Sequence, residues 1–206
     1  MKDFWNARYK EKAYAYGKNP NLFFKDSLDK LNVSGKILLP AEGEGRNAVY
    51  AAKKGLDVLA FDISAEGKNK ALKLAQLENV EIDYRVGELN QLNLKKNNFD
   101  VLALIYAHFP ENQKKELHQE LVKLIKPNGY IILEGFSVNN LAYREKNPNV
   151  GGPANANMLY SVEEMRDTFK DFEIIELQET EVELNEGQFH NGLACVIRFI
   201  GKKIAS

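Results

Sequence analysis

A glycine turn between two short apolar runs constrains the fold of this chain more than any other feature. Residues 36–41 form the first apolar run, the turn reads Glu-Gly-Glu-Gly-Arg over 42–46, and the second apolar run closes on Asp62. A helix-like stretch separates the turn from the second run. This order predicts one β-α-β unit, in which Gly43 and Gly45 allow a sharp turn and a close approach between a ligand and the backbone.

The turn and the end of the second strand predict a site for an adenosine-containing cofactor. We expect the free N–H groups at the start of the helix, which Arg46 opens, to face that ligand. Asp62 ends the second strand, where a carboxylate can accept hydrogen bonds from both hydroxyls of a ribose. The segment from Gly43 to Ala48 also satisfies the dinucleotide fingerprint G-x-G-x-x-G/A. This stretch alone therefore leaves a dinucleotide and S-adenosylmethionine open.

The rest of the chain alternates between strand-like and helix-like stretches, which predicts a parallel sheet covered by helices on both faces. Near the end of the chain two strand-like runs follow each other with no helix between them, which predicts an antiparallel hairpin. The fold class we expect is α/β, with a Rossmann-like, seven-stranded, mostly parallel sheet and an antiparallel C-terminal hairpin. The expected strands are 36–41, 57–61, 81–86, 99–106, 129–136, 172–184 and 193–200, and the expected helices are 46–54, 64–78, 111–126 and 161–169.

The length of 206 residues predicts a single domain over residues 1–206. Within it we expect a helical, aromatic-rich cap over residues 1–32 and a Rossmann-like core over 33–206. Residues 137–160 form a long connection, and long structureless connections in compact domains are usually lids or binding loops. We expect Gly151 and Gly152 to act as its hinges.

Composition excludes several partners. The net charge of −1 gives no long-range attraction to nucleic acid or to an anionic membrane. No apolar run reaches the ~20 residues of a membrane span, and the first residues lack the apolar core of a signal peptide. The single cysteine, Cys195, excludes an intramolecular disulfide and a multi-cysteine zinc site, and we expect it to be buried. The expected location is the cytoplasm, no metal site is expected, and the oligomeric state stays open.

The chain resembles the class I S-adenosylmethionine-dependent methyltransferases over most of its length. Within that class it is similar to small bacterial enzymes related to the tellurite-resistance methyltransferase and, more distantly, to thiopurine methyltransferases. It departs from the usual first-loop pattern at Leu39, where an acid is common, and at Ala41, where a glycine is common. The stretches that carry the resemblance are 43–48, 61–64, 86–89, 99–101, 126–130 and 186–190, with Trp5-Asn6-x-x-Tyr9 and Tyr16-Gly17 near the start.

The resemblance implies an S-adenosylmethionine-dependent methyltransferase that leaves S-adenosylhomocysteine as its product. The implied acceptor is a small molecule of the thiol, thiopurine or chalcogen oxyanion class. Glu88 stands where an aspartate of the family often faces the adenine amino group. The residues expected to bind the cofactor are Trp5, Tyr16, Ala41, Glu42, Gly43, Gly45, Arg46, Asp62, Ile63, Glu88, Leu89 and Tyr106.

Two histidines are the expected catalytic residues. His108 follows the fourth strand, at the carboxyl edge where ligands bind in open α/β sheets. His190 lies in the hairpin turn, which returns to that edge if the sixth strand runs parallel to the fifth, and the resemblance implies an active-site histidine there. Either could act as a base for a hydroxyl or amine acceptor. The third, His118, is expected on a surface helix.

Two other functions remain open at this stage, an NAD-dependent oxidoreductase and a non-catalytic adenosyl-binding module. The terminal hairpin, the Lys126-to-Gly129 turn and Arg46, which opens the helix where a pyrophosphate usually requires small residues, favour the methyltransferase over the oxidoreductase. Around the acceptor we expect Tyr143, Arg144, Tyr160 and Arg198.

Overall fold

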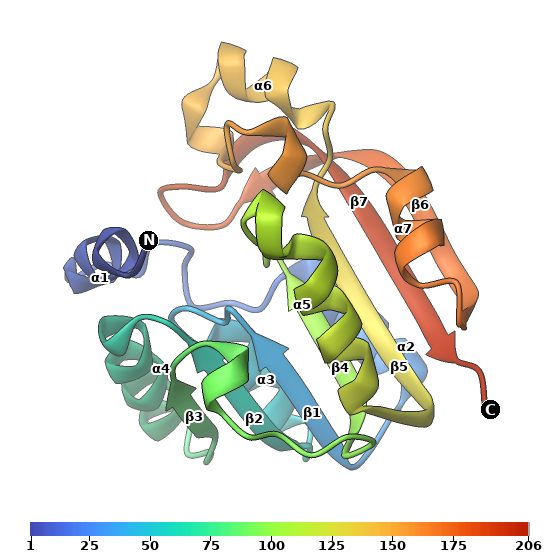
Figure 1. The fold of residues 1–206 in the computed structure, drawn as a ribbon. Coiled ribbons are helices and arrows are strands. Elements are labelled where there is room, and N and C mark those ends of the chain that lie inside the picture. The colour runs from blue at the N-terminus through green and yellow to red at the C-terminus, as the bar shows by residue number, and fades with distance from the viewer. Residues whose placement is uncertain (206) are drawn as a thin grey trace.

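The computed structural model describes residues 1–205, and its central feature is a seven-stranded sheet with the order β3-β2-β1-β4-β5-β7-β6 (Figure 1). Strands β1 to β5 are parallel, whereas β7 is antiparallel to both of its neighbours. The predicted fold class is thereby confirmed. The strands are β1 (Lys36–Pro40), β2 (Asp57–Asp62), β3 (Asp83–Val86), β4 (Phe99–Ile105), β5 (Ile125–Phe136), β6 (Phe172–Asn185) and β7 (Asn191–Lys203).

Seven α-helices and three 3-10 helices occur among residues 1–205. None of them is long and apolar enough to cross a membrane. The α-helices are α1 (Lys2–Lys10), α2 (Leu22–Leu31), α3 (Arg46–Lys53), α4 (Ala65–Leu77), α5 (Glu111–Leu124), α6 (Asn140–Lys146) and α7 (Val162–Thr168), and the 3-10 helices are η1 (Leu89–Gln91), η2 (Pro148–Val150) and η3 (Ala156–Met158).

Helices cover both faces of the sheet, because the central strands are apolar on both sides. Along β4, Val101 and Ala103 belong to the cluster that includes residues of α2 and α3. Leu102 and Leu104 alternate with them and belong to the cluster that includes residues of α5 and α7. Figure 1 shows α5 and α7 in front of the sheet, with α2 and α3 behind it.

The N-terminal 32 residues are not one continuous helical cap. Residues 11–21 between α1 and α2 are not helical, and Asn21 begins α2 by accepting a hydrogen bond from the Phe24 backbone at 2.9 Å. Phe24 is fully buried in the core cluster, so α2 belongs to the core. The division at residue 32 stays a prediction, and the end of the expected domain, residue 206, lies outside the described residues.

The Lys126-to-Gly129 turn lies inside a strand. We expected a helix up to 126 and a strand from 129, but α5 ends at Leu124 and β5 begins at once. The pairing of β4 with β5 shifts register between Phe99 and Val101, where the turn forms a bulge. Lys126 holds the bulge by pairing with both carboxylate oxygens of Asp100 at 2.8 Å.

The expectation of a structureless connection over 137–160 is wrong, since it contains α6, η2 and η3. Tyr160 fixes one end, because its hydroxyl donates to the Ala107 carbonyl at 2.5 Å. Asn140 fixes the other end by accepting from the Cys195 backbone at 3.0 Å. A Cβ at Gly151 would lie 2.7 Å from the His190 ring, so this glycine permits close packing, and hinge motion stays a prediction. Cys195 is buried, as predicted.

Candidate functional site

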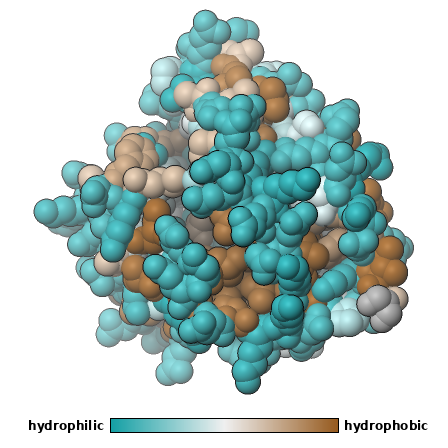
Figure 2. Space-filling view, in the orientation of Figure 1, coloured by the Kyte–Doolittle hydropathy of each residue, from teal (hydrophilic) through white to brown (hydrophobic). Residues whose placement is uncertain are grey.

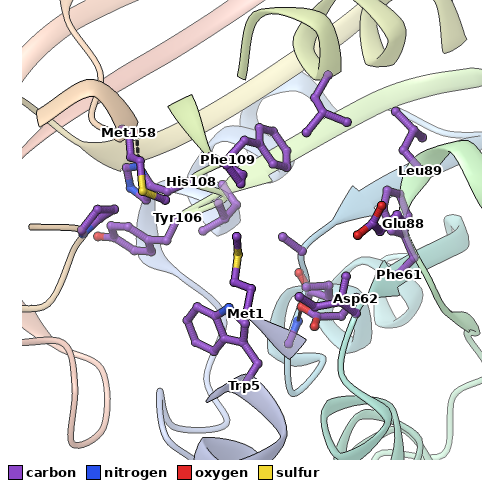
Figure 3. Close-up of a pocket in the computed structure, with 18 of the residues that line it drawn as sticks. Met1, Trp5, Phe61, Asp62, Glu88, Leu89, Tyr106, His108, Phe109 and Met158 are labelled. Atoms are coloured by element: carbon purple, nitrogen blue, oxygen red, sulfur yellow. Dashed lines mark hydrogen bonds between the residues drawn. The ribbon is translucent and has the colours of Figure 1, made fainter. Parts of the chain in front are cut away.

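A cavity of about 1500 Å³ opens at the carboxyl edge of the parallel strands. Pockets for one drug-sized ligand measure ~300–1000 Å³, so this cavity can hold a cofactor and an acceptor together. Figure 3 shows Met1 and Trp5, from the start of the chain and from α1, on one side, Tyr106, His108 and Phe109 opposite, and Asp62 with Glu88 on a third side. All the residues expected to bind the cofactor or to act in catalysis line the cavity, except Gly45.

Gly45 packs closely against α4 and is not among the residues that line the cavity. It has φ of +85°, and a Cβ added there would lie 2.5 Å from Cβ of Ala71 in α4. The side of Gly45 where a Cβ would point is therefore occupied by α4, and its role in cofactor binding stays a prediction. Gly43 does line the cavity, and its N–H donates to Asp62 at 3.0 Å.

The side chain of Glu42 caps the N-terminus of α3. One oxygen of this buried carboxylate accepts hydrogen bonds from the backbone of Asn47 at 2.9 Å and of Ala48 at 2.8 Å. The expectation that these N–H groups face a ligand is wrong, since an acid of the same loop already satisfies them. Burial raises the pKa of Glu42 to about 7, although these hydrogen bonds oppose the rise.

Asp62 joins the glycine turn to the start of α4. Its two oxygens accept from the backbone of Gly43 and of Ser64, at 3.0 and 2.9 Å. Burial raises the pKa of Asp62, against these hydrogen bonds. Each carboxylate oxygen has a second lone pair, so Asp62 can accept from two hydroxyls of a ligand without losing its backbone partners.

Glu88, which lies on the same side of the cavity as Asp62, forms a capping box with Gln91 over η1. Ile63 and Leu89 add apolar surface to the same part of the cavity. This combination suits the flat, apolar faces and polar edge of an adenine.

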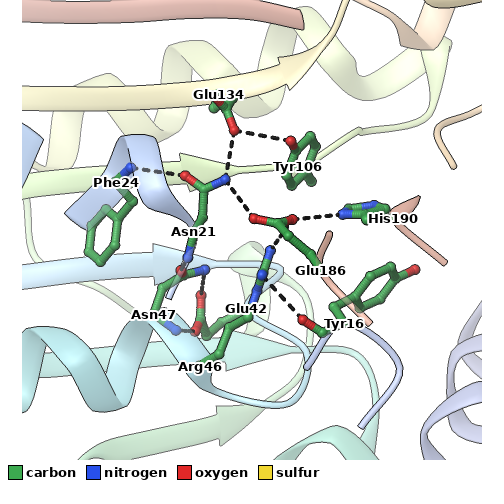
Figure 4. A network of polar contacts seen from close by, with 10 residues as sticks. All are labelled: Tyr16, Asn21, Phe24, Glu42, Arg46, Asn47, Tyr106, Glu134, Glu186 and His190. Carbon is green, nitrogen blue, oxygen red and sulfur yellow. Dashed lines mark hydrogen bonds and ion pairs between the residues drawn. The ribbon is translucent and has the colours of Figure 1, made fainter. Parts of the chain in front are cut away.

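A buried network of polar side chains lies next to Tyr106 and His190 (Figure 4). Arg46, which we expected to face a ligand, pairs with Glu186 at 2.8 Å and donates to the Tyr16 carbonyl at 3.2 Å. Asn21 donates to Glu134 at 2.6 Å and to Glu186 at 3.1 Å. The Arg46 charge is therefore balanced within the protein, although the residue lines the cavity.

His190 lies between this network and the cavity. Its Nδ1 is 3.1 Å from Glu186 Oε2, and the rings of Tyr16 and Tyr106 are each centred 4.4 Å from its imidazole. Burial lowers the pKa of His190, and the Glu186 carboxylate opposes that shift. Within residues 1–205, no hydrogen bond to its Nε2 is found. The hairpin turn thus returns to the edge where ligands bind, as predicted.

His108 also lines the cavity, but both of its ring nitrogens have backbone partners. Nδ1 lies 2.9 Å from the Met158 carbonyl, and Nε2 accepts from the Phe136 N–H at 3.1 Å. Burial lowers the pKa of His108 to about 4. A neutral imidazole has one donor and one acceptor, so in this conformation neither nitrogen is available to a substrate.

Several residues expected near the acceptor or on the surface lie elsewhere. His118 is 1% exposed and not on the surface, because its ring packs among Phe109, Tyr160 and Phe169. Of the four residues expected around the acceptor, only Arg144 lines the cavity. Arg198 instead pairs with Glu134 at 2.6 Å.

The N-terminal aromatics close one side of the cavity. Trp5 lines it and stacks on Tyr9 with ring centroids 5.4 Å apart. Arg8 lies over the ring of Phe189 in the hairpin turn at 4.2 Å and donates to the Tyr16 hydroxyl at 2.9 Å. Helix α1 and the hairpin turn therefore form one wall.

The sequence reasoning missed Asn21, Glu134 and Glu186 as members of the site. Glu186 lies within the stretch 186–190 that carries the resemblance, so that stretch already contained a signal. Asn21 and Glu134 carried none, because a helix-capping asparagine and a glutamate ending an apolar strand acquire their site contacts only in three dimensions.

The strand order defines the class of fold. In the usual dinucleotide-binding fold the strand order is 3-2-1-4-5-6, whereas here the reversed β7 inserts between β5 and β6. The glycine turn, the acid at the end of β2 and this reversed strand together define a Rossmann-like methyltransferase fold.

Comparisons with known proteins agree with that class. Residues 37–129 match the family model described as a methyltransferase domain. The demethylmenaquinone methyltransferase of Renibacterium salmoninarum is 28% identical over 102 residues, which are 50% of this chain and 41% of that protein.

Two solved structures share the fold. One comes from a study of the conversion of a disulfide bond into a thioacetal group during echinomycin biosynthesis, with a TM-score of 0.77, 16% identity, and coverage of 99% of this chain and 92% of that one. The other is TehB from Haemophilus influenzae, with a TM-score of 0.71, 18% identity, and coverage of 98% and 66%.

The family model and these curated relatives are methyltransferases, which agrees with the predicted reaction class. This chain spans about two-fifths of the length of the curated relatives that it matches. A specific relation to tellurite-resistance or thiopurine methyltransferases is not confirmed.

Proposed function

We propose that this chain transfers a methyl group from S-adenosylmethionine to a small-molecule acceptor. One observation carries the proposal: a single cavity is lined by both Asp62 and His190. Nδ1 of His190 pairs with Glu186, whereas its Nε2 has no hydrogen-bond partner within residues 1–205. Asp62 and Glu88 would hold the ribose and the adenine amino group, and Ile63 with Leu89 would contact the adenine. S-adenosylhomocysteine would be the product.

The reaction would be an in-line displacement at the methyl carbon. The sulfonium already activates this carbon, so the protein mainly aligns the two reactants and excludes water. The faces of Trp5, Tyr16 and Tyr106, which line the cavity, would stabilise the sulfonium cation by ~0.5–2 kcal/mol. His190 is the better base of the two histidines, because both nitrogens of His108 are engaged.

The part of the cavity that we assign to the acceptor favours a small, soft or planar molecule. Phe109, Phe136 and Met158 line it with apolar surface, and Arg144 adds a positive charge. This lining fits a thiol, a thiopurine or a chalcogen oxyanion, the classes expected from the sequence. A ring hydroxyl or ring carbon of a quinol is a second candidate, since two of the curated relatives are demethylmenaquinone methyltransferases.

Calorimetry with the full chain tests the cofactor. S-adenosylmethionine and S-adenosylhomocysteine should bind and raise Tm, whereas NAD should do neither. Binding of NAD alone would refute the proposal in favour of an oxidoreductase. Turnover assays with thiols, thiopurines, selenite, tellurite and a short-chain demethylquinol then identify the acceptor. Cofactor binding without turnover of any acceptor would favour the non-catalytic adenosyl-binding module.

Replacing Asp62 tests the ribose site. Asp62→Ala should weaken S-adenosylhomocysteine binding roughly 10- to 100-fold, because hydrogen bonds to a charged acceptor contribute about 1.5–3 kcal/mol. Asp57→Ala is the matched control, since Asp57 begins the same strand and is exposed. Equal affinities of the two variants would remove Asp62 from the site. The absence of nucleic-acid and membrane partners and the cytoplasmic location stay predictions.

A further inference from the structure

Three hydrogen-bond donors converge on the carboxylate of Glu186 (Figure 4). Oε2 is 2.8 Å from an Arg46 nitrogen and 3.1 Å from Nδ1 of His190, and Oε1 is 3.1 Å from the Asn21 amide. The donors come from α3, from the hairpin turn and from the segment before α2. Only 13% of the Glu186 side chain is exposed, so these contacts replace most of its hydration.

This arrangement requires an ionised carboxylate. Burial raises the pKa of Glu186, but the His190 hydrogen bond and the Arg46 charge outweigh burial and lower it to about 2. An ionised carboxylate can only accept hydrogen bonds. Nδ1 of His190 must therefore carry the proton, and in the neutral imidazole Nε2 then keeps a lone pair.

We propose that Glu186 is a positioning residue that holds His190 in its Nδ1–H tautomer and so presents the Nε2 lone pair to the methyl acceptor. Asn21 and Arg46 hold Glu186 in turn. The tautomer follows from the contacts alone, whereas its catalytic use rests on the proposed methyl transfer.

This geometry allows Nε2 to take up the proton that the acceptor loses during methyl transfer. An acceptor O–H or N–H donates to Nε2, and its lone pair attacks the methyl carbon. The bond from carbon to sulfur breaks, its electron pair stays on sulfur as a thioether, and the acceptor proton passes to Nε2. The resulting imidazolium is stabilised by the adjacent Glu186 carboxylate and later releases the proton to solvent.

The tautomer can be measured without any activity. The chain has three histidines, so nitrogen-15 NMR of the histidine-labelled full chain is tractable, with His190→Gln assigning the signals. At pH 8 we expect a protonated Nδ1 and an unprotonated Nε2 for His190. The opposite tautomer would overturn the proposal, even if S-adenosylmethionine binds and methyl transfer occurs.

The positioning role is tested by Glu186→Gln, which keeps the shape and removes the charge. The kcat of the variant should fall roughly 10- to 100-fold, part of the ~10²–10⁴-fold effect of a general base, with little change in KM. Because the carboxylate raises the pKa of His190, its loss should move the acid limb of the pH profile to lower pH. Besides Glu186, the titratable groups that face His190 are Arg8, Tyr16, Arg46, Tyr106 and His108.

A matched control separates this effect from the loss of any buried ion pair. Glu164→Gln breaks the pair with the buried Lys114, 2.7 Å long and formed between α7 and α5. Its kcat and acid limb should stay at the wild-type values. A Glu186→Gln enzyme with wild-type kcat, or with reduced kcat at an unmoved acid limb, would overturn the positioning role. Failure to bind S-adenosylmethionine would refute the proposed function and leave the tautomer result standing.

Discussion

At the scale of single residues, the three histidines of this chain have three different environments. His190 has one nitrogen held by Glu186, and His108 has both nitrogens held by the backbone. His118 is buried, and within residues 1–205 neither of its ring nitrogens has a hydrogen-bond partner. An unsatisfied buried polar group costs about 1–3 kcal/mol, so His118 destabilises the fold as it stands.

His118→Phe should therefore stabilise the protein. Burial lowers the pKa of His118 to about 3, below the ~6.5 of the unfolded state, so the unfolded state binds a proton that the folded state does not. The free energy of unfolding is therefore reduced further as pH falls below 6.5. The variant removes that loss, and its gain in unfolding free energy should be larger at pH 5 than at pH 8. Urea unfolding at both pH values measures this. An equal or smaller gain at pH 5 would contradict the environment described for His118.

At the scale of elements, the β-α-β units could be predicted from sequence because each strand and helix there has its own periodicity. The elements missed were those that depend on tertiary contacts. Helix α6 and the 3-10 helices of 137–160 are short, and Tyr160 and Asn140 anchor that segment to the rest of the fold. The break between α1 and α2 was also missed, since residues 1–32 were expected to be helical although Asn19-Pro20 lies within the break.

The site residues, too, could be predicted where local structure positions them and not where tertiary contacts do. Residues fixed by the strand ends, such as Asp62 and Tyr106, do line the cavity. The contacts of Arg46 could not be predicted, because its partner Glu186 lies 140 residues away in sequence. Spacing predicts which residues lie at an edge, but not which of them pair there.

The wall formed by α1 and the hairpin turn depends on Arg8. Its guanidinium lies 4.6 Å from the Phe4 ring and 4.2 Å from the Phe189 ring. Arg8→Ala removes cation–π contacts of ~0.5–2 kcal/mol, so backbone hydrogen exchange in α1 should rise several-fold. Lys10→Ala, an exposed position in the same helix, should leave exchange unchanged. Wild-type exchange in Arg8→Ala would show that α1 is held by its packing on α4 alone.

At the scale of the whole molecule, buried titratable groups predict how stability depends on pH. Burial lowers the pKa of His108, His118 and His190, so the stability that they contribute above pH 6.5 is lost as pH falls. Glu42 acts in the opposite sense, since its pKa of about 7 means that its contribution is present below ~4.5 and lost as pH rises through 7.

Three histidines act against two acids, Glu42 and Asp62, whose pKa values burial raises. The free energy of unfolding should therefore fall between pH 6.5 and pH 4.5. The urea midpoint measured in half-unit steps of pH checks this. A midpoint that rises toward pH 4.5 would contradict the burial of the histidines.

The contact between Asn21 and Glu186 joins residues 165 positions apart in sequence. A nascent chain that still lacks the hairpin turn has the glycine loop and Asp62 but no His190 beside them. The cavity is therefore complete only in the finished chain, because the hairpin turn supplies Phe189 and His190 to its lining. Closing so long a loop is entropically unfavourable, and a bound ligand that touches both ends would return part of that free energy. Occupancy of the cavity and completion of the fold should therefore be thermodynamically linked.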